Sequence, residues 1–128
     1  AMELEDGTII TAKTTTLLGC SAALILNVIK HLAGIGHDVK LIPQSMIEPI
    51  QKTKIEYLGG NNPRLHTDEV LVALSVLSQH NEQCRRALEQ LPHLLGCQVH
   101  TTIMLGEVDR KIFKKLGCNL TCDPVKKK

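Results

Sequence analysis

The most suggestive chemistry in this sequence lies at Lys13 and Thr14, where an expected strand meets an expected helix. The segment from Gly7 to Thr14 nearly matches the phosphate-loop pattern G-x4-G-K-[ST], with Ala12 in place of the second glycine. Residues 8–11 read Thr-Ile-Ile-Thr, which favours a strand over an amide-exposing turn. The remaining hypothesis is an anion site of Lys13 and Thr14 at a helix N-terminus. The alternative is that residues 14–16 only cap the helix.

A second candidate is the loop that precedes the helix expected from Thr67. It runs through Gly-Gly-Asn-Asn-Pro at residues 59–63 and continues with Arg64 and His66. Loops whose conformation is restricted by such turn-forming residues often present ligand-binding groups. Asn62, Arg64 and His66 are therefore candidate binding residues. The alternative is a structural turn in which Arg64 pairs with a carboxylate.

His100 is the third candidate, either as a site residue at a strand end or as a core histidine with satisfied hydrogen bonds. Metal binding is not expected, because Cys97 and His100 fall on opposite faces of a strand. Cys118 and Cys122 would lie about 13 Å apart along a strand, too far to share an ion. No catalytic residue or cofactor can be assigned.

Composition narrows the class of protein. The 128 residues carry 15 basic and 13 acidic side chains, but three of the lysines form a tail at 126–128, and without them the counts are 12 and 13. This near-neutral body, with one Tyr and one Phe, argues against a nucleic-acid partner. We also expect no membrane partner, a cytoplasmic location and reduced thiols, since five cysteines without compact spacing follow no secretory signal.

The hydrophobic pattern predicts the elements that must position these residues. The fold class expected is α/β, a layered sandwich with a mixed sheet and a helical insertion over 44–93, all within one domain that spans 1–128. Asn81 caps one of the expected helices, and Ser45 and Glu48 have the spacing of a capping box. The expected strands are 4–13 (turning at Asp6-Gly7), 39–42, 98–104 and 118–122; the expected helices are 14–32, 45–58, one from 67, one from 82 and 107–116.

Several segments, in this order, resemble a bacterial family called "uncharacterised protein family zero three seven one", a domain of unknown function. The block from Asn62 to Leu71 is the most specific, and Ala12 is a departure from the glycine that the family usually carries. The matching segments are Thr8–Thr14, Leu17–Gly19, Glu48–Gln51, Tyr57–Gly59, Asn62–Leu71, Glu89–Pro92 and Asn119–Cys122.

The resemblance implies that the chain is the C-terminal domain of a protein of several hundred residues, with a phosphate-loop-like stretch upstream. It also implies a sandwich related in topology to cytidine deaminase. The zinc ligands and catalytic glutamate of that chemistry are missing here, so the activity does not follow.

Two hypotheses about function follow. In the first, this module contributes to a site for a small anionic ligand or nucleotide, completed by the upstream domain. Its binding residues would be Lys13, Thr14, Asn62, Arg64, His66 and His100. In the second, it is a structural or oligomerisation domain, with a possible homo-oligomer as its assembly and no chemistry of its own.

Overall fold

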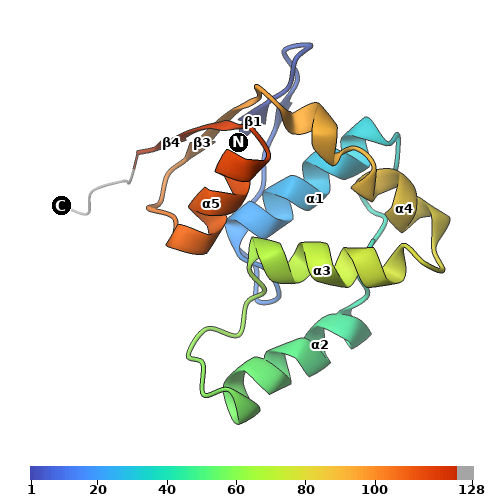
Figure 1. The fold of residues 1–128 in the computed structure, drawn as a ribbon, viewed down its shortest axis with the longest axis vertical. Coiled ribbons are helices and arrows are strands. Elements are labelled where there is room, and N and C mark those ends of the chain that lie inside the picture. Colours follow the sequence, from blue (N-terminus) through green and yellow to red (C-terminus); the bar gives the residue numbers. More distant parts are fainter. Residues whose placement is uncertain (124–128) are drawn as a thin grey trace.

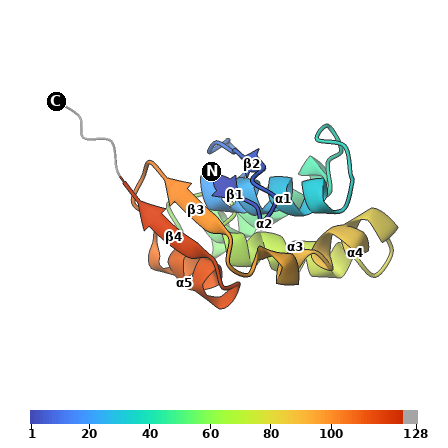
Figure 2. The ribbon, with the colours of Figure 1, turned by 90° about the horizontal axis from the view of Figure 1, so that it is seen from above.

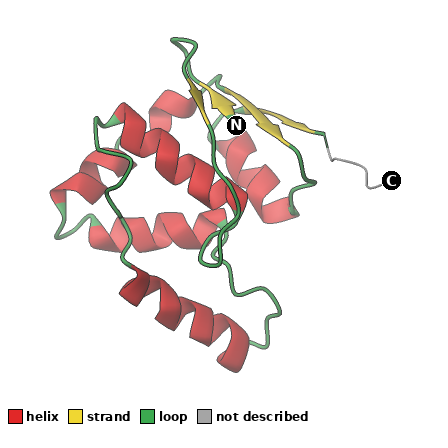
Figure 3. Ribbon diagram, turned by 180° about the vertical axis from the view of Figure 1, so that it is seen from behind, coloured by secondary structure: helices red, strands yellow, loops and turns green. Residues whose placement is uncertain are grey.

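The computed structural model describes residues 1–123, and the lysine tail expected at 126–128 lies outside them. A four-stranded mixed sheet forms one layer, and helices pack against one of its faces (Figures 1 and 3). The elements are β1 (Met2–Glu3), β2 (Ile9–Ile10), α1 (Cys20–Leu32), α2 (Gln44–Lys52), the π-helical turn η1 (Thr53–Tyr57), α3 (Thr67–Leu77), α4 (Glu82–Leu88), the 3-10 turn η2 (Leu91–Leu94), β3 (Gln98–Thr101), α5 (Glu107–Lys115) and β4 (Asn119–Cys122).

The sheet has the order β2-β1-β3-β4. β1 is antiparallel to both of its neighbours, whereas β3 and β4 run parallel and are joined through α5, the connection that parallel strands need. Alternate residues of β3 are buried, which places Val99 and Thr101 on the helical side and Gln98 and His100 on the open side. The sheet is therefore covered on one face and exposed on the other (Figure 2).

Helix α1 is the central helix of the domain. It is apolar on most sides and contacts β2, α3 and α4. Ile25, Val28 and Ile29 are fully buried along it, and Gly34, with a φ of 72°, turns the chain away after its end. Phe113 of α5 and Met2 of β1 complete the core beneath the sheet. The core thus joins the sheet layer to the helical layer.

Most predicted elements are confirmed, including the hairpin at Asp6-Gly7 and the cap from Asn81, whose side chain accepts from the Cys84 N–H at 3.1 Å. Four predicted elements differ from the structure. The hairpin strands expected within 4–13 are Met2–Glu3 and Ile9–Ile10, so the first lies before residue 4 and the second ends at Ile10. The segment 39–42, expected as a strand, is a loop with a bend at residues 41–42, and the Lys30 ammonium donates to the carbonyls of His37 and Val39. The strand expected over 98–104 ends at Thr101, whose hydroxyl donates to the Ile103 carbonyl at 2.8 Å.

The helix expected from Thr14 begins only at Cys20. The Thr15 hydroxyl accepts from the N–H groups of Leu17 and Leu18, which holds residues 15–18 in a turn. The capping box expected between Ser45 and Glu48 is also wrong. Helix α2 begins one residue earlier, directly after Pro43, and Glu48 accepts instead from the Gln44 amide. Pro49 lies inside this helix.

None of the helices within residues 1–123 combines the length and the apolar character needed to cross a membrane.

Candidate functional site

Two loops far apart in sequence lie side by side and carry most of the predicted binding residues. Leu18 and Leu65 form a parallel bridge, and the Leu65 N–H donates to the Leu17 carbonyl at 2.9 Å. The Arg64 Nε donates to the Thr15 carbonyl at 2.6 Å across a separation of 49 residues. Segment 11–19 and segment 59–66 are therefore joined by both backbone and side chain.

The second of these loops is held from inside. Asn62 accepts from the Arg64 N–H at 3.0 Å, a turn that asparagine forms readily. The ammonium of Lys54, only 14% exposed, donates to the Arg64 carbonyl at 2.6 Å and pairs with Glu69 at 2.8 Å. Glu69 also accepts from the His66 N–H at 2.8 Å, which completes a capping box at the start of α3. The loop is therefore fixed in one conformation.

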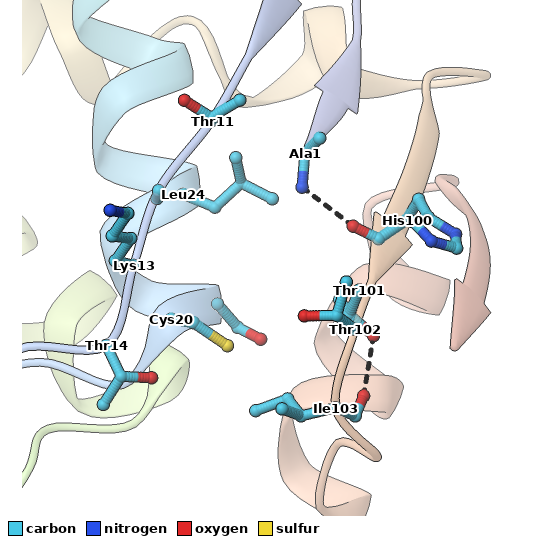
Figure 4. Close-up of a pocket in the computed structure, with 12 residues that line it drawn as sticks. Ala1, Thr11, Lys13, Thr14, Cys20, Leu24, His100, Thr101, Thr102 and Ile103 are labelled. Atoms are coloured by element: carbon cyan, nitrogen blue, oxygen red, sulfur yellow. Dashed lines mark hydrogen bonds between the residues drawn. The ribbon is translucent and has the colours of Figure 1, made fainter. Parts of the chain in front are cut away.

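A hollow of about 370 Å³ lies between segment 11–14, the start of α1 and the end of β3. In Figure 4, Lys13 and Thr14 stand on one side, Thr101 and Ile103 stand on the other, and Cys20 of α1 lies between them.

A second hollow, of about 420 Å³, is lined by Asn62, Arg64 and His66 together with the start of α5. The two hollows share three lining residues, so we treat them as one feature and call it the groove. Helices α1, α3 and α5 all begin at the groove, through Gly19, His66 and Gly106. The shared residues are Thr14, Cys20 and Ile103.

Five of the six predicted site residues line this groove: Lys13, Thr14, Asn62, Arg64 and His66. In Figure 4 the Thr14 side chain faces the hollow, whereas the Lys13 side chain extends from the far side of segment 11–14. His100 lines it too, but its imidazole is directed away from the hollow in Figure 4. The cause is the alternation of side chains along β3, which places this ring on the open face of the sheet. His100 contributes its carbonyl, which accepts from the amino group of Ala1 at 2.8 Å.

The cationic side chains of the groove have no acidic partner. Neither Lys13 nor Arg64 makes an ion pair with any carboxylate in residues 1–123. The acidic residues at the start of α5 are already engaged: Glu107 pairs with Lys111 at 3.0 Å, and Asp109 accepts from the Thr67 hydroxyl at 2.8 Å. The groove therefore combines unpaired positive charge with the N-terminus of α1, whose first turn has no acidic residue, and this environment favours anions.

One group of possible metal ligands occurs within residues 1–123. His66, Asp68 and Glu69 place ligand atoms within 4.8 Å of one another at the start of α3. Glu69 already receives the Lys54 ammonium and the His66 N–H, and Asp68 accepts from the Glu69 N–H at 2.9 Å. Helix capping and the ion pair account for the cluster without a metal.

The three buried cysteines are poorly suited to nucleophilic catalysis. All five are free, and burial raises the pKa of Cys84, Cys97 and Cys118, the last to about 11. A thiol with a raised pKa is a poor nucleophile. Cys20 is half-buried and lines the groove.

Sequence reasoning missed Ser21 and the pair Thr67–Asp109. Ser21 lines the first hollow and is 1% exposed. It was overlooked because a helix that starts at residue 14 puts Ser21 two turns inside, whereas it lies in the first turn of α1. The Thr67–Asp109 contact spans 42 residues and leaves no local signal.

Comparisons with known proteins agree with the resemblance. A family model described as "Domain of unknown function DUF1846, C-terminal" matches residues 1–128. A UPF0371 protein of Corynebacterium urealyticum is 58% identical over 124 residues, covering 97% of this chain and 25% of the relative. A UPF0371 protein of Streptococcus thermophilus is 45% identical over the same shares of the two chains. The chain thus spans about a quarter of the length of the curated relatives it matches.

The match over the whole chain and the identity to these relatives lead to one assignment. The chain belongs to the uncharacterised UPF0371 family, as its C-terminal DUF1846 domain.

Proposed function

We propose that this domain binds a small anionic ligand, a nucleotide or another phosphorylated metabolite, in the groove. The observation that supports it best is the gathering of Lys13 and Arg64, both without a carboxylate partner in residues 1–123, at a point where three helices begin. Two unpaired cations and the N-terminus of α1, which has no acidic residue in its first turn, act in the same direction on an anion.

The rest of the longer protein would complete the site. The relatives are about four times as long as the stretch that they share with this chain, so they carry an upstream part. Ala1 lies at the first hollow, where its amino group donates to the His100 carbonyl. An upstream part that joins the domain at this residue would enter beside the groove. We therefore propose the upstream domain as the partner that closes the site.

The test is binding of adenosine triphosphate and a sugar phosphate to the chain, followed by calorimetry and thermal shift. Arg64→Ala and Lys13→Ala should each weaken binding by roughly tenfold, the effect of one charge-assisted hydrogen bond. Arg85→Ala is the matched control, because this exposed arginine on α4 pairs with Glu82 at 3.3 Å and does not line the groove. Equal affinities in all four proteins would contradict the proposal.

The alternative, a structural or oligomerisation domain, is favoured by one observation. Val72 and Val76 lie one turn apart on α3, and they are 65% and 58% exposed. Such a pair of valines suits a contact with another chain or domain. If Val72→Asp and Val76→Asp abolish a dimer seen by sedimentation while Arg64→Ala leaves ligand binding unchanged, the alternative replaces the binding proposal.

We also keep as a proposal the cytidine-deaminase-like topology that the resemblance implies. Its support is the mixed four-stranded sheet with helices on one face. We propose no deaminase activity with this topology, because the zinc ligands and the catalytic glutamate of that reaction are missing from the sequence.

A further inference from the structure

The N-terminus of α1 is the least satisfied helix end at the groove. Its N-cap residue, Gly19, has no side chain, and no acidic residue lies in the first turn of this 13-residue helix. The N–H groups of Cys20, Ser21 and Ala22 have no acceptor among residues 1–123. These donors lie at the positive end of the helix dipole, where an anion is stabilised.

The other two helix ends at the groove are compensated. At the start of α3, Asp109 accepts from the Thr67 hydroxyl and Glu69 accepts from the His66 N–H. Helix α5 has Glu107 and Asp109 in its own first turn. Carboxylates neutralise the field at both places, so the positive potential of the groove is concentrated at α1.

Ser21 provides an independent observation at the same place. Its side chain is 1% exposed and lines the first hollow, and its hydroxyl oxygen has no hydrogen-bond partner in residues 1–123. A buried hydroxyl without a partner destabilises the folded state, and native proteins rarely keep one without a reason. A ligand oxygen bound at the N-terminus of α1 would accept this hydrogen bond.

The donors around this point match a tetrahedral oxyanion better than a planar carboxylate. Backbone N–H groups and the Ser21 hydroxyl, both from α1, lie at one hollow, and the Thr14 hydroxyl faces it from segment 11–14 (Figure 4). A phosphoryl group has three peripheral oxygens, one for each kind of donor, and a carboxylate has two.

We propose that the phosphoryl group of a phosphomonoester binds at the N-terminus of α1, held by the N–H groups of residues 20–22 and the hydroxyl of Ser21. This rests on the proposed anion site and specifies its ligand class and anchor. Ser21 acts as a hydrogen-bond donor, and Lys13 supplies the balancing charge. The organic part of the ligand extends along the groove towards Arg64 and His66.

The test is a nuclear magnetic resonance titration of the chain with inorganic phosphate, with acetate as the carboxylate comparison at matched ionic strength. Phosphate should shift the amide resonances of residues 20–22 more than any others, and acetate should bind more weakly. Ser21→Ala should weaken phosphate binding by roughly tenfold or more. Ser75→Ala, an exposed serine whose hydroxyl bonds the Leu71 carbonyl, should leave it unchanged.

A second variant isolates the backbone donors. Gly19 has a φ of −66° and a ψ of 160°, the conformation that a residue before proline prefers. Cys20→Pro therefore fits the first helical position and removes one N–H donor without breaking α1. It should bind phosphate more weakly than Cys20→Ala, which keeps that donor.

The outcomes separate the two proposals. If phosphate binds at Arg64 and His66 while Ser21→Ala and Cys20→Pro leave the affinity unchanged, the α1 anchor is refuted and the general anion site stands. If neither phosphate, acetate nor adenosine triphosphate binds, both proposals fall. Loss of affinity in both variants, with resonance shifts at residues 20–22, supports the anchor.

Discussion

The contact between Thr67 and Asp109 allows the sharpest test of how the groove is held together. Thr67 begins α3 and is 1% exposed, and its hydroxyl donates to the Asp109 carboxylate at 2.8 Å. The Thr67 N–H approaches the same oxygen at 3.4 Å. One carboxylate on α5 therefore satisfies a buried hydroxyl and caps the neighbouring helix.

Asp109→Ala should lower the free energy of unfolding by about 2–4 kcal/mol. About 1 kcal/mol comes from the lost cap of α3, and roughly 1–3 kcal/mol comes from leaving the Thr67 hydroxyl buried without a partner. Asp109→Asn keeps an acceptor oxygen, so it should cost less than about 1 kcal/mol. The exposed Glu89 is the control, and Glu89→Ala should change stability by less than about 0.5 kcal/mol.

The assay is urea unfolding followed by far-ultraviolet circular dichroism, in a double-mutant cycle with Thr67→Val. Valine keeps the shape of threonine and removes the hydroxyl, so Asp109→Ala should cost much less in that background. The difference between the two backgrounds should be roughly 1–3 kcal/mol. Equal costs of Asp109→Ala beside threonine and beside valine would refute the reasoning, because the hydroxyl would then not be what the carboxylate stabilises.

Three further predictions follow from contacts of the described residues. Iodoacetamide at pH 8 should modify the half-buried Cys20 and Cys122 in the native chain and all five cysteines after denaturation. Mass spectrometry would identify the modified residues, and modification of the three buried thiols at the same rate in the native chain would contradict this prediction. Burial raises the pKa of Cys118 from its ordinary value of 9.0 to about 11, so the folded state holds this proton more tightly than the unfolded state does. Stability should therefore fall as pH rises from 9.0 to 11. Cys118→Ala should flatten this fall in urea titrations, and an unchanged slope would exclude the thiol as its source. Lys54→Met should lower the free energy of unfolding by roughly 1–3 kcal/mol and weaken anion binding, because the Arg64 carbonyl and the Glu69 carboxylate lose their common donor. Unchanged anion affinity in calorimetry would show that the loop keeps its shape without Lys54.

Local signals account for most of the fold. Hydrophobic periodicity placed α1, α3 and α5, and the Asn81 cap was predicted because its hydrogen bond reaches only three residues along the chain. The errors occurred where a side chain competes with regular backbone pairing. The Thr15 hydroxyl holds the turn before α1, and the Lys30 ammonium binds the carbonyl of Val39 in the expected strand at 39–42 together with that of His37 just before it. Neither interaction has a periodic signature.

The candidate site was predictable in its residue types and not in its assembly. Lys13, Arg64 and His66 were chosen for their positions beside helix starts, and all three line the groove. That the two loops meet depends on the Leu18–Leu65 bridge, a contact between distant segments. Ser21 was missed for a related reason, since its importance depends on where α1 begins. Side chains alternate along a strand, so an error of one residue in the predicted alternation would place a side chain such as His100 on the wrong face of the sheet.

The position of β1 in the sheet has a practical consequence for handling the domain. This two-residue strand pairs with β2 on one side and with β3 on the other, so Met2 and Glu3 join the hairpin to the rest of the sheet. Deleting residues 1–3 would remove the strand that β2 pairs with and, with Met2, a fully buried core side chain. A protease that trims these residues, or a bulky tag fused directly before them, would therefore disturb the middle of the sheet and the groove beside it. Expression designs should therefore separate any N-terminal tag from residue 1 by a long linker.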